Sequence, residues 1–389
     1  MKRTVTILIV FCLGFTLFAG DNLKVSGQFR YRYHLSASDF DSETDANTFS
    51  VMRTRLNVAI NPADDVQAFV QYQDSRTTGT ETNTLTDGTA DAFDLHQGYV
   101  KVDNLFALPV DLKLGRYEVA LGPQRLVGSV GWHNIGRSFD GVTFTYHNPL
   151  FDVDLFSFKT FEDADDELDV FVRGAYANMK LENYKAQAFF ILDDERSTYG
   201  VYAKGEIFPG LTHETEFAMQ SGTVEDVDPS IGDVDQAGML YAFNFTYDMN
   251  GILLSAGYDH VSGNDTDTEE NEAFSTLYAT NHKYYGYMDY FLNIPAHTNK
   301  LGLNDIHFRV SKLKFAGIAA QLDFHLFSSE FENDNGDTDF GSEFDVTLVK
   351  KYNDNVKFVA GYSIFTPGNL KAEDGDNGSG GYLMTLVNF

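Results

Sequence analysis

Arginine recurs at alternate positions in two early segments of the chain, as Arg30 and Arg32 and then as Arg53 and Arg55. On β-strands each pair would point to one face and form a short row of guanidinium groups. Guanidinium groups bind carboxylates through two parallel hydrogen bonds, so these rows could bind anionic solutes. The alternative is that neighbouring carboxylates neutralise the arginines, which then only brace the wall. Both interpretations require strands that enclose a polar interior.

Later segments carry acidic residues at the corresponding polar positions, with one arginine among them: Asp259, Asp305, Arg309, Asp323, Glu343 and Asp345. If the first and last strands meet in a closed barrel, the basic and acidic groups produce a transverse field across a water-filled lumen. We therefore predict a pore lining with a basic side and an acidic side.

Other chemistry finds little support in the spacing of residues. Ten histidines occur without H-x-x-x-H or H-E-x-x-H spacing, so we expect no metal site and no cofactor. Ser, His and Asp show no pattern that pairs them, so we expect no enzyme. The acidic stretches 226–235, 264–272 and 334–339 lack the residue order of an EF-hand loop, which favours solvated loops over calcium sites.

Alternation with period two identifies the elements that would position these residues. In the segment 24–35, Val25, Tyr31 and Leu35 share one face, whereas Arg30 and Arg32 share the other. Residues 52–60 and 357–364 repeat the pattern, with Val359 as an exception. Each segment is therefore predicted to be a strand with one apolar and one polar face.

The connections between these strands alternate in length. Short ones carry turn residues, at 61–65, 148–150, 208–210, 248–251 and 352–355, whereas long polar ones lie at 77–91, 223–235, 264–300 and 330–339. Tight periplasmic turns and long outer loops are typical of membrane barrels. We predict an all-β fold, a single closed antiparallel transmembrane β-barrel of about 18 strands.

The amino terminus indicates export. Lys2 and Arg3 precede an apolar run from Val5 to Phe18, and Ala19 offers a small residue for cleavage. We predict a signal peptide over 1–19 and the barrel over 20–389. Cys12, within that peptide, is the only cysteine, so no disulfide is expected.

Composition restricts the partners. The net charge of −29 argues against nucleic acid, and 14% aromatic residues argue against a disordered acidic chain. The final strand ends on an aromatic residue, Phe389. In outer-membrane barrels a terminal Phe helps the assembly machinery to recognise the chain. The expected partners are therefore outer-membrane lipid and the assembly machinery, and the expected location is the cell outer membrane.

Residues 112–142 read LKLGRYEVALGPQRLVGSVGWHNIGRSFDGV, and they resemble the alginate-export family of outer-membrane barrels. Segments 52–58 (MRTRLNV), 69–76 (FVQYQDSR), 94–100 (DLHQGYV), 257–264 (GYDHVSGN) and 284–289 (YYGYMD) match the same family in order. The resemblance implies a single-chain barrel of about 18 strands whose pore carries an anionic polysaccharide outward.

The part of this block from 118 to 139 is too long and Gly-rich for a turn, which is consistent with an ordered loop folded into a pore. Arg116, Arg125, Arg137 and Asp140 could hold that loop to the wall. Whether the three arginines also line the pore and bind solute stays open at this point.

Our interpretation is a passive pore for an anionic saccharide or a similar solute. The alternative is a general diffusion porin without polymer specificity, and a third class is a structural or adhesive barrel. Small polar solutes and self-association into a homo-oligomer remain open, as do the direction of transport and plugging by loops.

Overall fold

A computed structural model of the chain describes residues 22–78, 93–162, 169–225, 233–265, 268, 270–372 and 375–389. The predicted signal peptide at 1–19 lies outside these residues, as does most of the predicted long connection at 77–91.

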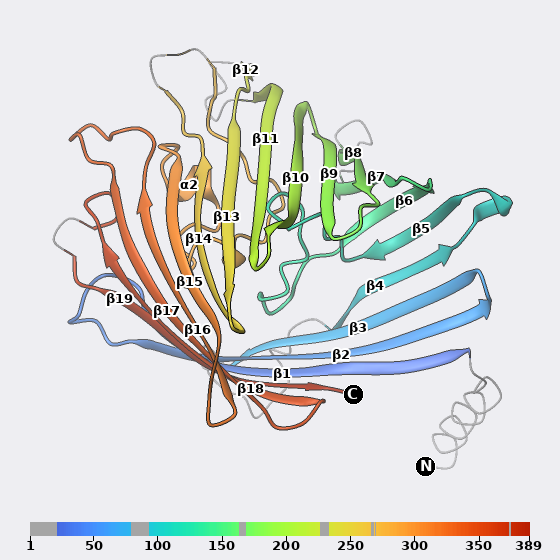
Figure 1. Cartoon of the computed structure of the whole chain (residues 1–389), viewed down its shortest axis with the longest axis horizontal. Coiled ribbons are helices and arrows are strands. Elements are labelled where there is room, and N and C mark those ends of the chain that lie inside the picture. Colours follow the sequence, from blue (N-terminus) through green and yellow to red (C-terminus); the bar gives the residue numbers. More distant parts are fainter. Residues whose placement is uncertain are drawn as a thin grey trace.

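Antiparallel strands follow one another around a closed wall in the described part of the chain (Figure 1). β12 pairs only with the end of β11, whereas the other eighteen strands form the barrel, and β19 pairs with β1 to close it. The predicted closed antiparallel barrel of about eighteen strands is confirmed. The strands are β1 (Leu23–Ala37), β2 (Asn47–Ala63), β3 (Val66–Thr78), β4 (Phe93–Val102), β5 (Val110–Tyr117), β6 (Phe139–His147), β7 (Phe151–Phe161), β8 (Val170–Met179), β9 (Tyr184–Asp193), β10 (Arg196–Phe208), β11 (Leu211–Glu225), β12 (Asp233–Asp235), β13 (Met239–Met249), β14 (Ile252–Val261), β15 (Leu303–Phe315), β16 (Ile318–Ser328), β17 (Asp339–Lys351), β18 (Val356–Pro367) and β19 (Gly378–Asn388).

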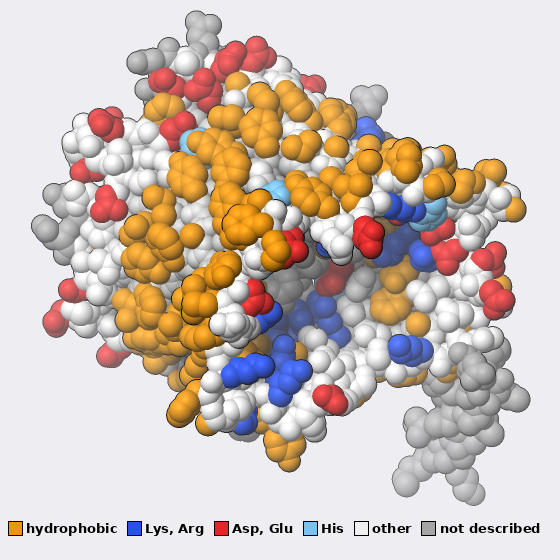
Figure 2. Space-filling model, in the orientation of Figure 1, with side chains coloured by type: hydrophobic (Ala, Val, Ile, Leu, Met, Phe, Trp, Pro, Cys, Tyr) orange, Lys and Arg blue, Asp and Glu red, His pale blue; other side chains and the backbone are white. Residues whose placement is uncertain are grey.

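The two faces of each strand differ as the alternation predicts. Tyr31 and Leu56 are 41% and 42% exposed on the outside, whereas Arg30 and Arg53 are buried on the inside. Figure 2 shows hydrophobic side chains over much of the visible outer surface. An apolar outer surface around a polar interior is typical of membrane barrels.

Short turns connect the strands at one end of the barrel. Asn250 and Gly251, between β13 and β14, have φ values of 56° and 91°. Two successive positive φ angles define the type I′ turn, whose twist matches that of the strands it joins. The carboxyl terminus lies at this same end, because the Gly27 amide donates a hydrogen bond to the Phe389 carbonyl at 2.7 Å.

Two connections at the opposite end fold back into the barrel. We call residues 118–138, between β5 and β6, inner segment 1, and residues 271–302, between β14 and β15, inner segment 2. Inner segment 2 contains η4 (Asn281–Lys283) and α2 (Ile294–His297). The segments contact each other through an isolated bridge between Val127 and Tyr278. Among the described helices, none is long and apolar enough to cross a membrane.

The position of inner segment 2 differs from our expectation of an exposed outer loop over 264–300. Phe274, Tyr285, Phe291 and Ile294 are at most 2% exposed and belong to the main apolar cluster of the molecule. That cluster joins the inner segments to an apolar strip of the inner wall that includes Phe158 and, among others, Ile191, Leu240, Phe327 and Phe365. Burial of these side chains favours the folded-in position over a solvated one.

Candidate functional site

The predicted basic side of the lumen forms a compact group on β1 and β2. Arg30 pairs directly with Arg53 in the register of the two strands, and Arg55 lies opposite Gln28. The four guanidinium groups of Arg30, Arg32, Arg53 and Arg55, which we call the arginine ladder, are only 4–9% exposed because inner segment 1 covers them.

Backbone carbonyls of inner segment 1 accept hydrogen bonds from the arginine ladder. Arg30 donates to the carbonyls of Gly131 and His133, both at 2.9 Å. Arg53 donates to the His133 carbonyl at 3.2 Å. The Arg32 guanidinium lies 3.8 Å from the centre of the Trp132 ring and donates to the carbonyl of the same residue at 3.1 Å. The ladder therefore holds the segment in place.

These contacts leave most of the ladder's charge uncancelled. Arg55 pairs with Glu118 at 3.0 Å. Among the described residues, Arg30, Arg32 and Arg53 form no ion pair with a carboxylate. Carbonyl oxygens satisfy N–H groups without removing net charge, so a positive potential persists here.

A cavity of about 710 Å³ opens beside the ladder. Its lining includes Arg32, His34, Trp132, Asp289 and Tyr382. Trp132 stacks on His282 of inner segment 2, with ring centres 4.4 Å apart. The cavity therefore combines one guanidinium group with aromatic faces. Figure 2 shows Lys and Arg side chains gathered around a hollow in the molecule.

The predicted acidic side lies on β14 to β17 and is separated from the ladder by β18 and β19. Each of its five carboxylates is at most 2% exposed: Asp259, Asp305, Asp323, Glu343 and Asp345. Asp323 pairs with Arg309 from the neighbouring strand, and Glu343 accepts backbone N–H groups of Tyr287 at 2.5 Å and Met288 at 2.8 Å. Glu343 therefore anchors inner segment 2 to the wall.

Arg125 ties inner segment 1 to the acidic wall. Its guanidinium contacts Asp259 at 2.5 Å and Glu216 at 3.6 Å, and it lies 3.8 Å from the centre of the Tyr284 ring. Burial alone would lower the pKa of Arg125, but the charge of Asp259 and neighbouring groups raises the pKa well above its usual value. This side chain is therefore a charged anchor inside the barrel.

The remaining two predicted arginines lie apart from the ladder. Arg137 donates to the backbone carbonyl of Tyr278 and so joins the two inner segments. Arg116 lies on the outer face of β5 together with Leu114, and its side chain, 41% exposed, pairs with Asp140 at 2.6 Å. Our placement of Arg116 in the pore lining is wrong, because side chains alternate along β5 and the next residue, Tyr117, packs on Phe158 at the inner face.

Sequence reasoning missed the contribution of carbonyl groups and of inner segment 2. Every residue has a backbone carbonyl, so the residue types do not reveal that the carbonyls of Gly131, Trp132 and His133 bind the ladder. The density of aromatic residues in 271–302 was the available signal, because a solvated loop rarely carries so many.

Several solved bacterial structures have a similar fold. OccAB1 of Acinetobacter baumannii superposes with a TM-score of 0.65 at 14% identity, covering 96% of this chain and 97% of that chain. OccK5 (OpdH) of Pseudomonas aeruginosa superposes with a TM-score of 0.64 at 13% identity, covering 95% of this chain and 98% of that chain. A BenF-like porin from Pseudomonas fluorescens Pf-5 superposes with a TM-score of 0.64 at 10% identity, covering 96% of this chain and 99% of that chain.

At such identities these structures establish the fold alone. A comparison with curated proteins finds no match. The alginate export family, in contrast, matches residues 21–381, which include both inner segments and nearly the whole barrel. With its closed barrel and its covered arginine ladder, the chain belongs to the alginate-export family of outer-membrane β-barrels.

Proposed function

We propose that this chain is an outer-membrane pore that passes an anionic saccharide by passive transport. The observation that carries the proposal is the arginine ladder, in which Arg30, Arg32 and Arg53 keep their charge without a carboxylate partner among the described residues. A carboxylated sugar would find a positive potential there.

The cavity beside the ladder supports a saccharide over a small inorganic anion. Tyr382 lines the cavity close to the Arg32 guanidinium, together with the edge of Trp132, whose two ring faces contact Arg32 and His282. The aromatic ring of Tyr382 could pack against the apolar side of a sugar ring, while Arg32 binds its carboxylate. Family membership, established over residues 21–381, agrees with this substrate class.

A general diffusion porin is the second candidate, and the acidic wall favours it. Asp259, Asp305, Asp323, Glu343 and Asp345 would repel a polyanion unless cations screen them. The similar fold of the BenF-like porin also agrees with it.

Planar-bilayer recordings of the refolded barrel test the proposal. A uronate oligomer and a neutral glucose oligomer of equal length are compared as blockers of the current. We expect the uronate to block at lower concentration. In the variant Arg32→Gln with Arg53→Gln we expect block by the uronate to weaken more than block by the neutral oligomer, and reversal potentials to shift towards cations. These changes should shrink at high salt because ions screen the ladder.

Arg116→Gln is the matched control, since it removes a positive charge from the outer face of the wall. It should leave block and selectivity unchanged. Equal block by both oligomers would favour the general porin. So would a folded Arg32→Gln, Arg53→Gln variant whose block and reversal potential match those of the wild type.

A further inference from the structure

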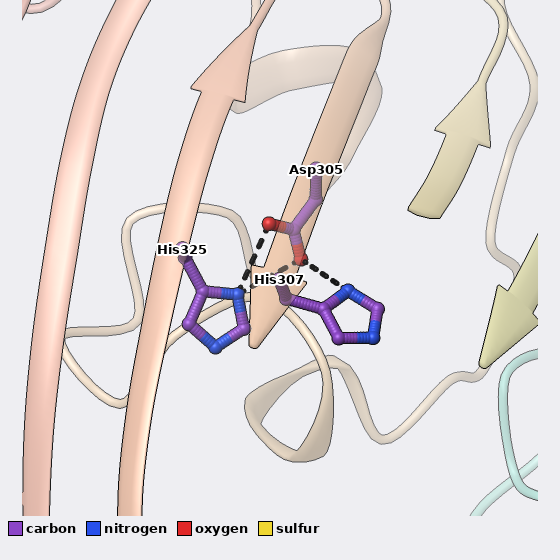
Figure 3. A group of neighbouring side chains, drawn as sticks. All are labelled: Asp305, His307 and His325. Atoms are coloured by element: carbon purple, nitrogen blue, oxygen red, sulfur yellow. Dashed lines mark hydrogen bonds and ion pairs between the residues drawn. The ribbon is translucent and has the colours of Figure 1, made fainter. Parts of the chain in front are cut away.

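Two histidines and one aspartate converge on the inner wall, on the acidic side (Figure 3). Asp305 and His307 share a face of β15 because they are two positions apart, and the strand register pairs His307 with His325 of β16. Asp305 Oδ2 lies 2.9 Å from Nδ1 of His325 and 3.4 Å from Nδ1 of His307. One donor atom from each residue lies within 4.8 Å of the others.

These separations match those within a metal coordination shell. Zn²⁺ binds imidazole nitrogen and carboxylate oxygen at about 2.0–2.2 Å, so ligand atoms in a tetrahedral site lie about 3.3 Å apart. The two distances from Asp305 Oδ2 bracket that value. Only small side-chain movements would therefore bring all three ligands onto one ion.

Hydrogen bonding within the cluster leaves it incompletely satisfied. Nδ1 of His307 is buried, and its 3.4 Å contact with Asp305 does not have the geometry of a hydrogen bond. On the adjacent strand β17, both carboxylate oxygens of Asp345 and Oε2 of Glu343 are also buried without a hydrogen-bond partner among the described residues. Buried acceptors without donors are destabilising, and a cation at the cluster would offset the negative potential that they create.

The cluster is open on one side only. His307 and His325 line a cavity of about 480 Å³ inside the barrel, whereas Asp305 is fully buried behind them. The His325 ring stacks on Phe327, with ring centres 5.3 Å apart and planes 9° apart, which holds its orientation. An ion could enter from the cavity, and water would complete its coordination on that side.

We infer that Asp305, His307 and His325 bind a divalent transition-metal ion of the Zn²⁺ type. Two imidazole ligands favour such ions over Mg²⁺ and Ca²⁺, which prefer oxygen ligands only. This inference goes beyond the proposed saccharide pore and is independent of it. A bound ion would add two positive charges to the acidic wall and so alter the field in the lumen.

Equilibrium dialysis of the chelator-treated, refolded full barrel against Zn²⁺ tests the site, with Co²⁺ as a spectroscopic probe. We expect one ion per chain and Co²⁺ absorption bands of a site with nitrogen ligands. His307→Gln and, separately, His325→Gln should each lower the affinity by at least about tenfold, because losing even a hydrogen-bond partner of a metal ligand typically costs about 10–100-fold. His213→Gln is the matched control, because His213 contacts Tyr184 and Thr215 rather than a carboxylate.

A second readout uses the pore itself. Zn²⁺ should shift the reversal potential of the wild-type barrel towards anions and leave that of His307→Gln unchanged. Folding of every variant is checked by the heat-dependent shift of the barrel band on gels. Absence of stoichiometric binding by the folded wild type would overturn the inference, as would binding that survives in folded His307→Gln and His325→Gln.

Discussion

At the scale of single residues, Arg125 ties inner segment 1 to the acidic wall, whereas the arginine ladder holds the segment on the basic side. Replacing it with Met leaves Asp259 and Glu216 buried without their cation. Breaking a buried pair by removing one partner costs about 3–5 kcal/mol, which we expect to be relieved by release of the segment from the wall. Arg125→Met should therefore raise single-channel conductance and current noise, measured in planar bilayers.

Arg116→Met provides the control for that measurement. The pair of Arg116 with Asp140 is 41% and 53% exposed, and exposed pairs contribute about 0–1 kcal/mol. Conductance should stay at the wild-type value. Equal conductance of Arg125→Met and Arg116→Met would show that Arg125 does not hold the segment.

Lys371, in the connection between β18 and β19, is a second residue with a testable electrostatic environment. Its Nζ lies 4.5 Å from the centre of the Phe291 ring and donates to the His297 carbonyl at 2.9 Å. Burial disfavours the charged ammonium and lowers the pKa of Lys371 to about 8. Acylation of Lys371, followed by mass spectrometry across pH, should therefore show its midpoint near pH 8.

Phe291→Ala should admit water to Lys371 and move that midpoint upward, towards the ordinary lysine pKa of 10.5. The direction in which pH changes folding stability also follows. Between these two pKa values the unfolded chain binds more protons than the folded one. Folding stability from this group therefore increases as pH rises through that window. A midpoint near 10.5 in the wild type would contradict the buried environment.

At the scale of elements, each strand presents one side chain in two to the surrounding medium. Leu56 of β2 is exposed on the outer face, and Asn57 lies on the inner face, where it accepts a hydrogen bond from Gln71 at 2.7 Å. Leu56→Arg should destabilise the folded barrel in lipid by about 2–4 kcal/mol, the cost of a cation near the bilayer midplane. Urea titration of folding into vesicles measures the difference.

Asn57→Arg should cost less in the same titration, because its side chain would reach the polar interior. A loss of stability equal to that of Leu56→Arg would mean that β2 does not separate a lipid-facing side from a lumen side.

At the scale of the whole molecule, the two ends of the barrel differ. The chain's only cysteine, Cys12, lies in the predicted signal peptide, so single cysteines can report on topology. Asp334 is exposed in the connection between β16 and β17, Asn250 is exposed in a short turn at the other end, and Ile294 is buried in inner segment 2. We expect a membrane-impermeant thiol reagent to label Asp334→Cys in intact cells.

Asn250→Cys should react only after the outer membrane is broken, and Ile294→Cys only after the barrel is unfolded. Labelling of Asn250→Cys in intact cells, with Asp334→Cys silent, would reverse the orientation. Rapid labelling of Ile294→Cys in the folded protein would place inner segment 2 outside the barrel.

The sequence by itself determined the strands, their faces and the closed barrel, along with the basic and acidic sides of the lumen. Alternation is a property of residues two positions apart, so it is readable wherever a wall separates an apolar from a polar environment. The glycines of 118–139 likewise predicted a segment folded into the pore, and the family block around them predicted membership in the alginate-export family.

Only the tertiary structure decided which groups the inward side chains meet. Arg30 and Gly131 are 101 positions apart, and Asp305 and His325 are 20 positions apart on two strands. The first contact depends on the position of the inner segments, which long-range packing of residues such as Phe274 and Phe291 determines. The second depends on the register of β15 with β16. The outward position of Arg116, in contrast, was readable from the sequence, because Arg116 alternates in step with Leu112 and Leu114, and our placement had followed its charge instead.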